Sequence, residues 1–242
     1  MKALITGGQQ GIGFGIAQAL HGAGWEVAIA SDVAPDAAED ALSKLPGATY
    51  HQHDVTDISA VPALLNDVGP ITTFISNAGV GAMQRGDLLD MSPESFDRCI
   101  NVNLRGAVFL AIDVARRMLE MPEDPFRSIT FITSVSAAIL SVDRAEYCIS
   151  KAAAAMAAQA FATRLAPENI GVYDIRPGII ETPMTAPVAE RYTTRIPHIV
   201  PAARWGQPSD IGSVIVPLAR GDFAFATGAQ IPVDGGLSIH RL

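Results

Sequence analysis

The stretch EYCISK places Tyr147 and Lys151 four positions apart. On a helix, residues at i and i+4 lie on one face, with Cβ atoms about 5 to 6 Å apart. A free tyrosine has a pKa near ~10 and exchanges protons poorly at neutral pH, whereas a nearby ammonium favours the phenolate and lowers that pKa. The pair therefore predicts a tyrosine acid and base that a lysine activates. The alternative is an exposed helix pair worth a few tenths of a kcal/mol.

Lysine is a rare choice in this chain. Only three lysines occur, Lys2, Lys44 and Lys151, against fourteen arginines. Lysine offers a compact ammonium with rotatable donors, whereas arginine presents a rigid planar fork. We therefore expect position 151 to need something that arginine cannot supply.

Short apolar runs alternate with helix-like segments along the chain, and these elements must position the pair. This alternation predicts right-handed βαβ crossovers and a Rossmann-type, doubly wound parallel sheet of about seven strands with helices on both faces. We expect one domain over residues 1–242. The expected strands are 2–7, 25–31, 48–54, 72–79, 127–136, 171–178 and 228–236. The expected helices lie within 11–24, 57–69, 92–120 and 146–168.

A glycine-rich loop follows the first expected strand. It carries Gly7, Gly11 and Gly13 and leads directly into a helix. Glycines let the backbone approach a diphosphate, which then lies at the helix N-terminus, where free N–H groups favour anions. The loop lacks the Gly-Lys-Ser/Thr ending of a P-loop. We expect dinucleotide binding; the alternative is a tight turn without a ligand.

Together with Tyr147 and Lys151, this spacing resembles the TGxxxGxG signature of the short-chain dehydrogenase/reductase family, in its classical subgroup. The resemblance continues in order along the chain. HDVTD at 53–57 and ISNAG at 75–79 match two further family motifs, with Ser76 replacing the first Asn of the second. NVNLRG, ITSVSA, RPGIIET and DGG match the remaining motifs.

The resemblance implies hydride transfer between a nicotinamide cofactor and a carbonyl or secondary alcohol, with Tyr147 as acid or base. Lys151 would also bind the nicotinamide ribose, Ser134 would hold the substrate oxygen, and Asn103 would hold a water that links the lysine to solvent. The implied catalytic residues are Asn103, Ser134, Tyr147 and Lys151. The implied cofactor-binding residues are Gly7, Gln10, Gly11, Ile12, Gly13, Asp32, Asp54, Val55, Asn77, Ala78, Gly79, Tyr147, Lys151, Pro177, Gly178, Ile180 and Thr182.

The end of the second strand bears on the choice between NAD and NADP. A carboxylate there accepts hydrogen bonds from the adenosine ribose and repels a 2′-phosphate, which an arginine would attract. The sequence IASDVAPD places Ser31 or Asp32 at this position, and no Arg or Lys follows closely. NAD is therefore favoured over NADP, although Asp32 would serve equally as a turn or helix N-cap residue.

Composition excludes several other classes. A net charge of −8 and a pI near 5.0 disfavour nucleic acid as a partner. No apolar stretch reaches membrane-spanning length and no signal peptide is apparent, so we expect a cytoplasmic location and no membrane. Cys99 and Cys148 predict neither a disulfide framework nor, with the scattered histidines, a metal site. Cys148 is expected to be a small buried helix residue rather than a redox sensor.

The substrate is less defined. We expect one or two of four arginines, Arg85, Arg144, Arg191 and Arg195, to bind a carboxylate, a phosphate or a phosphopantetheine, with Arg144 the first candidate; ordinary surface charge is the alternative. The proline-rich segment 183–208 is expected to form a flap over the substrate, or else a loop with one short helix.

Several functions share these motifs. A 3-oxoacyl-carrier-protein reductase is favoured slightly over a polyol, sugar or sugar-acid dehydrogenase. An epimerase or dehydratase of the extended branch is disfavoured by its different glycine spacing and usual longer C-terminal domain. A silent dinucleotide-binding sensor would be free to lose Ser134, Tyr147 or Lys151. The resemblance also implies a homotetramer built on the alanine-rich helix after Lys151, its neighbour and the C-terminal end; packing within one subunit is the alternative for this helix.

Overall fold

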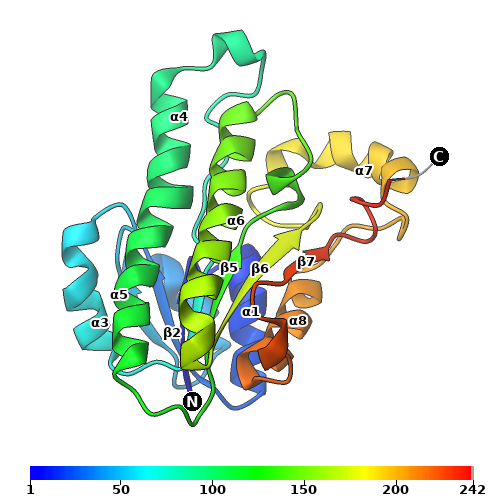
Figure 1. Cartoon of the computed structure of the whole chain (residues 1–242). Coiled ribbons are helices and arrows are strands. Elements are labelled where there is room, and N and C mark those ends of the chain that lie inside the picture. Colours follow the sequence, from blue (N-terminus) through cyan, green and yellow to red (C-terminus); the bar gives the residue numbers. More distant parts are fainter. Residues whose placement is uncertain (241–242) are drawn as a thin grey trace.

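Strands rich in apolar residues build the centre of the computed structural model, which describes residues 1–240 (Figure 1). The seven strands are all parallel and lie in the order β3-β2-β1-β4-β5-β6-β7. Their bounds are β1 Lys2–Thr6, β2 Glu26–Ser31, β3 Thr49–Gln52, β4 Thr73–Ser76, β5 Arg127–Ile132, β6 Ile170–Pro177 and β7 Gln230–Val233. The predicted seven-stranded, doubly wound sheet is confirmed.

Helices cover both faces of this sheet (Figure 1). Their bounds are α1 Gly11–Gly22, α2 Glu39–Ser43, α3 Val61–Val68, α4 Pro93–Ile100, α5 Ala107–Leu119, α6 Ala145–Leu165, α7 Ala189–Ile199 and α8 Pro208–Arg220. The segment 92–120 is not one uniform helix, because a π-helical stretch, Asn101–Gly106, joins α4 to α5. Helices α2 and α8 are not among the elements expected from the sequence.

Alternating strand residues divide the core into two clusters, as the period of a pleated strand requires. Leu4, Phe74 and Phe131 pack with α3, α5 and α6 on one face, while Ile5 and Ile75 pack with α1 and α8 on the other. Both faces of the central strands are therefore buried, which explains the apolar composition of the chain.

The strand order reverses between β1 and β4. In an open parallel sheet, the loops that leave two such strands turn to opposite faces and open a crevice at the carboxyl ends. The glycine loop leaves β1 and the Asn77 loop leaves β4 at this point. The crevice therefore receives both motifs that the sequence assigns to a cofactor.

Close packing of α1 against α8 holds the helix that begins at the glycine loop. A Cβ added at Gly15 would lie 2.5 Å from Pro208 Cβ and 2.6 Å from the Pro208 carbonyl oxygen. Real Cβ atoms do not approach backbone this closely, so a side chain at Gly15 would separate the two helices.

We expect Gly15→Ala to lower the free energy of unfolding by about 1–3 kcal/mol, since overpacking forces the backbone to shift. Gly22→Ala is the matched control in the same helix, because a Cβ there meets nothing within 4 Å. It should be neutral or stabilise by up to about 1 kcal/mol. Denaturant unfolding of both variants checks this, and equal stability of the two would contradict the packing argument.

Candidate active site

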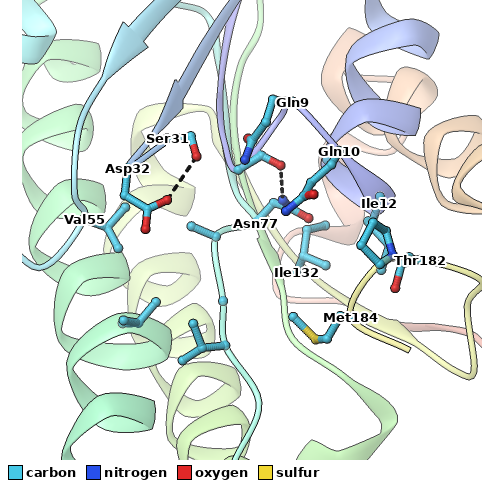
Figure 2. Close-up of a pocket in the computed structure, with 18 of the residues that line it drawn as sticks. Gln9, Gln10, Ile12, Ser31, Asp32, Val55, Asn77, Ile132, Thr182 and Met184 are labelled. Atoms are coloured by element: carbon cyan, nitrogen blue, oxygen red, sulfur yellow. Dashed lines mark hydrogen bonds between the residues drawn. The ribbon is translucent and has the colours of Figure 1, made fainter. Parts of the chain in front are cut away.

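The glycine loop and the Asn77 loop are bound together by hydrogen bonds at the reversal point. Asn77 Nδ2 donates to the carbonyl oxygens of Thr6, at 2.8 Å, and Gly7, at 3.2 Å. The backbone N–H groups of Asn77 and Ala78 both donate to Thr6 Oγ1 at 3.0 Å. Figure 2 shows Asn77 directly beneath the loop. Asn77 thus holds the loop after β4 against the glycine loop.

Gly13 is required by this arrangement. A Cβ on it would lie 2.2 Å from the Gly7 carbonyl oxygen and 2.5 Å from Asn77 Nδ2. The loop therefore closes on itself only with glycine at position 13. No side chain caps the start of helix α1. The first backbone N–H groups of the helix therefore face the cleft without a side-chain acceptor.

A single cleft collects most of the predicted cofactor residues (Figure 2). Its lining includes Gly7, Gln10, Gly11, Ile12, Gly13, Asp32, Asp54, Val55, Asn77, Ala78, Gly79, Tyr147, Lys151 and Thr182. The other three predicted residues, Pro177, Gly178 and Ile180, line an adjoining cavity of about 650 Å³ instead. Tyr147, Ile12, Thr133, Thr182 and Met184 line both spaces, so the two meet at the tyrosine.

Two residues that line the cleft carry buried polar atoms without partners. His53 Nε2 and Gln9 Oε1 are both buried and make no hydrogen bond, and both residues line the cleft. Buried polar atoms are normally paired, so these two are suited to groups of a bound molecule. The glycine cradle, the uncapped helix start and these atoms all fit a dinucleotide.

Asp32 places an exposed carboxylate directly after the end of β2. Ser31 is the last residue of the strand and is buried, while Asp32 is exposed and lines the cleft. Ser31 Oγ donates to Asp32 Oδ1 at 3.2 Å (Figure 2). Both residues line the cleft, and Asp32 is the one that brings a carboxylate to it.

Tyr147 and Lys151 lie on the first turns of α6 and are both buried. Lys151 Nζ donates to the carbonyl oxygen of Ile132, at the end of β5, at 2.9 Å. Burial lowers the pKa of Lys151 to about 8, against an opposing effect of Asp174. The lysine is therefore close to losing its charge in the physiological range.

The pKa of Tyr147 is raised, contrary to the sequence-based expectation. Burial causes the rise, and the Arg144 guanidinium and the Ser134 hydroxyl oppose it by smaller amounts. The expectation that Lys151 holds this pKa down is wrong for this structure, because desolvation penalises the phenolate more than nearby charge favours it.

Asn103 is buried in the π-helical stretch and belongs to a hydrogen-bond chain. Its Nδ2 donates to the Val80 carbonyl at 2.9 Å and to Ser150 Oγ at 2.9 Å, and its Oδ1 accepts from Val80 N at 2.7 Å. Ser150 Oγ in turn donates to the Tyr147 carbonyl at 2.8 Å. Asn103 thereby fixes the loop after β4 to the helix that carries Tyr147.

Ser134 and Arg144 line the adjoining cavity with Tyr147. Ser134 follows β5, and its Oγ accepts from Ser136 N at 3.0 Å. The Arg144 guanidinium carbon lies 4.7 Å from the centre of the Tyr147 ring. Arg85 and Arg195 line the same cavity, whereas Arg191 does not.

The segment 183–208 contributes α7 to this cavity. Val188, Tyr192, Arg195 and Ile199 line it, and the Tyr192 ring meets Trp205 edge-on at 6.0 Å between centroids. In Figure 1 the helix lies beyond the end of β6. The segment thus holds one helix of eleven residues over the cavity.

Some lining residues were not anticipated from the sequence. In the cleft these are Gln9, His53, Val80, Val102, Ile132, Thr133, Pro183 and Met184. Most adjoin a predicted residue, so neighbourhood in sequence was the available signal. Ile132 and Met184 adjoin no predicted residue, because their place in the lining depends on how β5 and the segment after Thr182 pack in the fold.

Residues 1–240 contain neither a helix fit to span a membrane nor a cluster fit to hold a metal. Within residues 1–240, no helix combines the length and the apolar character that a membrane span requires. In the same range, no group of three or more His, Cys, Asp or Glu side chains is placed to hold a metal ion. Both cysteines are unpaired and buried.

The fold and the cleft together define a dinucleotide-binding enzyme with a lysine in the cleft and a tyrosine where the cleft meets the adjoining cavity. Residues 7–238 match the family model described as enoyl-(acyl carrier protein) reductase. The chain belongs to the short-chain dehydrogenase/reductase family. The predicted family, and with it the oxidoreductase class, is confirmed.

Named relatives and solved structures span the whole chain. A Mycobacterium bovis protein, 3-oxoacyl-[acyl-carrier-protein] reductase MabA, is 35% identical over 242 residues, covering 98% of this chain and 93% of its own. The structure of a Brucella melitensis 3-oxoacyl-[acyl-carrier protein] reductase with NAD has a TM-score of 0.94 and 44% identity, covering 100% and 98%. A candidate 2-deoxy-D-gluconate 3-dehydrogenase from Agrobacterium tumefaciens with bound NADP has a TM-score of 0.84 and 30% identity, covering 98% and 95%.

The pKa of Lys151 gives a prediction for stability. The ordinary pKa is 10.5 and the folded value is about 8, so between them the unfolded chain binds a proton that the folded chain has lost. The wild-type free energy of unfolding therefore gains from rising pH in this window. The free energy of unfolding of the wild type, taken relative to that of Lys151→Met, should rise by about 1.4 kcal/mol per pH unit between about pH 8 and 10.

Urea unfolding across this pH range checks the prediction. Lys44→Met, at an exposed position paired with Asp40, controls for the loss of one positive charge. The same pH dependence in both variants, or none in either, would show that the burial of Lys151 is not its cause.

Proposed function

We propose that this protein transfers hydride between a nicotinamide dinucleotide and a carbonyl or secondary alcohol, with Tyr147 moving the proton. The observation that carries the proposal is that Tyr147 lines both the cofactor cleft and the substrate cavity. A bound nicotinamide supplies or accepts the hydride. Tyr147 then donates the proton to the substrate oxygen in reduction and removes it in oxidation.

The neighbouring residues prepare this step. Ser134, in the same cavity, holds the substrate oxygen, and Lys151 reaches toward the cofactor ribose from the cleft. The raised pKa of Tyr147 favours its protonated form, so the free protein is prepared to donate. Asn103 maintains the position of the tyrosine helix through Ser150, and its water-holding role stays a prediction.

Tyr147→Phe should lower kcat/KM by about 10²- to 10⁴-fold, because the acid and base group is lost while the ring remains. A spectrophotometric assay of nicotinamide oxidation against acyl thioesters, sugar acids, polyols and cyclic ketones measures this. Cofactor affinity should stay near that of the wild type. Tyr50→Phe, outside the cleft lining, is the control. Dinucleotide binding without turnover on any of these compounds would favour the silent sensor instead.

We propose NAD as the preferred cofactor. The exposed Asp32 carboxylate supports this, because it would repel a 2′-phosphate and accept hydrogen bonds from ribose hydroxyls. No Arg or Lys lines the cleft near Asp32 in the described part of the chain; its only cation is Lys151. Relatives with NAD and with NADP are both known, so the preference rests on this chain's own residues.

Asp32→Asn should raise the ratio of kcat/KM for NADPH over NADH by about tenfold, equivalent to about 1.4 kcal/mol. Steady-state kinetics with both reduced cofactors checks this. Asp36→Asn, an exposed carboxylate outside the cleft lining, serves as the control. An unchanged ratio would place Asp32 among turn residues rather than ribose ligands.

We propose a 3-oxoacyl thioester as one substrate class, supported by the names of the relatives from Mycobacterium and Brucella. A second class, the sugar acids and related oxo acids, is favoured by the arginine lining of the cavity. The proposed flap at 183–208 would cover either substrate.

The homotetramer and the cytoplasmic location stay predictions. Exposed apolar side chains on α5 and α6, Phe109, Ile149 and Met156, support an interface on these helices. Phe225, ahead of β7, is also exposed and supports a contact near the C-terminal end. Such side chains on one molecule commonly mark subunit contacts.

A further inference from the structure

The substrate cavity is positively charged although the protein is acidic. Its lining contains Arg85, Arg144 and Arg195, and no Asp or Glu of the described chain lines it. The net charge of the whole chain is −8. A cavity that gathers arginine without carboxylates is suited to an anionic ligand.

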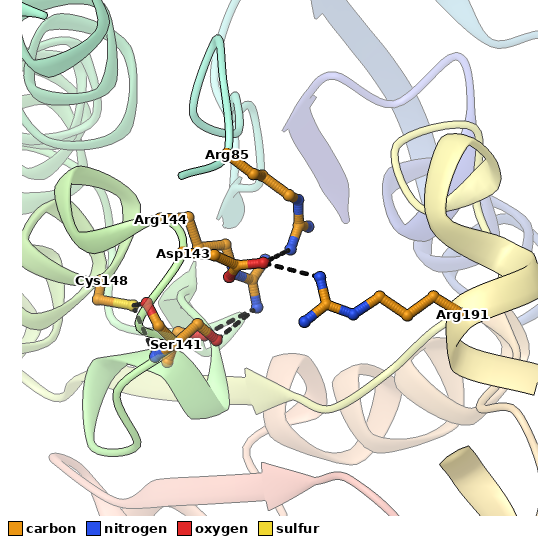
Figure 3. Close-up of polar contacts among 7 residues, drawn as sticks. Arg85, Ser141, Asp143, Arg144, Cys148 and Arg191 are labelled. Atoms are coloured by element: carbon orange, nitrogen blue, oxygen red, sulfur yellow. Dashed lines mark hydrogen bonds and ion pairs between the residues drawn. The ribbon is translucent and has the colours of Figure 1, made fainter. Parts of the chain in front are cut away.

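The arginines around the cavity are not equivalent, and two of them are already paired. Asp143 accepts from Arg85 Nη1 at 3.4 Å and from Arg191 Nη1 at 2.9 Å (Figure 3). Asp143 therefore joins the loop after β4 to α7 and neutralises part of the charge of both arginines. Arg195 is exposed.

Arg144 differs from Arg85 and Arg191 because no carboxylate of residues 1–240 pairs with it, and it differs from Arg195 because it is half-buried. Its Nη2 donates to the hydroxyls of Ser136 and Ser141, each at 3.2 Å (Figure 3). Its Nε is buried and has no hydrogen-bond partner. A guanidinium has five N–H donors and a full charge, and neutral hydroxyls leave that charge uncompensated. Such a group is suited to a ligand anion, which would supply the missing charge.

This unpaired guanidinium lies beside the reacting groups. Its carbon is 4.7 Å from the centre of the Tyr147 ring. Ser136, which binds it, also donates its N–H to Ser134 Oγ at 3.0 Å. A substrate oxygen held by Ser134 and Tyr147 is therefore within a few bonds of a group that Arg144 could hold.

We propose that Arg144 binds a carboxylate of the substrate a few bonds from the reacting carbon, so that the substrates are oxo acids and the corresponding hydroxy acids. The inference rests on the proposed hydride transfer at Tyr147 and chooses between its two substrate classes. In a 3-oxoacyl thioester a neutral carbonyl replaces the carboxylate and leaves the Arg144 charge unbalanced. Sugar acids and free 3-oxo acids both supply the missing anion.

The experiment compares acids with amides of nearly the same shape. The probes are 2-oxobutyrate, acetoacetate and levulinate, each with its primary amide, gluconate with gluconamide, and acetoacetyl-CoA. For at least one pair, the wild type should prefer the acid, and Arg144→Ala should lower the acid-to-amide ratio of kcat/KM by about 10- to 100-fold. Arg144→Lys should recover part of the ratio, since it keeps the charge and loses the fork.

Controls separate substrate binding from other effects of the charge. Lys44→Ala removes one exposed positive charge far along the sequence and should leave the ratio unchanged. Arg144 also favours the Tyr147 phenolate, but a loss of that effect would lower turnover of acid and amide alike. Equal losses on both members of each pair would therefore overturn the proposal.

Two other outcomes are also decisive. A wild-type preference for acetoacetyl-CoA over every free acid would overturn the carboxylate assignment while leaving the hydride-transfer function intact. Turnover of none of these compounds would contradict the proposed function instead. In that case, calorimetry of acetoacetate binding to the complex of protein and dinucleotide tests Arg144 directly. Loss of this binding in Arg144→Ala would support the carboxylate assignment, and unchanged binding would overturn it.

Discussion

The burial of Tyr147 and Lys151 against the end of β5 is the constraint on which the site depends. Both side chains are withdrawn from water, and the ammonium is held by one main-chain carbonyl, that of Ile132. Removing a charge from water costs free energy, and this cost lowers the pKa of Lys151. The sheet, α6 and the π-helical stretch must all be in place for this arrangement to form.

Hydrogen bonds between distant loops transmit this constraint through the site. Asn103 connects the loop after β4 to α6 through Ser150, and Asn77 connects the same loop to the glycine turn. The Asn103 amide both donates and accepts, and the Asn77 amide donates twice, so that each joins segments far apart in the chain. The cofactor cleft and the tyrosine are consequently positioned by one continuous network. A rigid arrangement of this kind favours hydride transfer, which needs its two partners in close and fixed contact.

The electrostatics of the site divide it into two parts. The cofactor cleft carries the Asp32 carboxylate and the uncapped start of α1, whereas the adjoining cavity is lined by arginine alone among charged residues of the described chain. Asp143 lies outside this cavity and holds two of the neighbouring arginines. The Arg144 guanidinium, which pairs with no carboxylate of residues 1–240, lies beside Tyr147, where it can influence both substrate choice and proton transfer.

The sequence alone determined the sheet, the family and most of the residues that line the cofactor cleft. These follow from local patterns: apolar runs of strand length, glycines at fixed spacing, and a tyrosine and lysine one helical turn apart. Helix α8 escaped prediction because its pattern begins in a proline-rich segment, and the sequence could not show the break in 92–120. The tertiary structure decided the pKa shifts, the orphaned His53 nitrogen and the pairing of Arg85 and Arg191 with Asp143. Desolvation and ion pairing depend on which distant segments pack together, and that information exists only once the chain has folded.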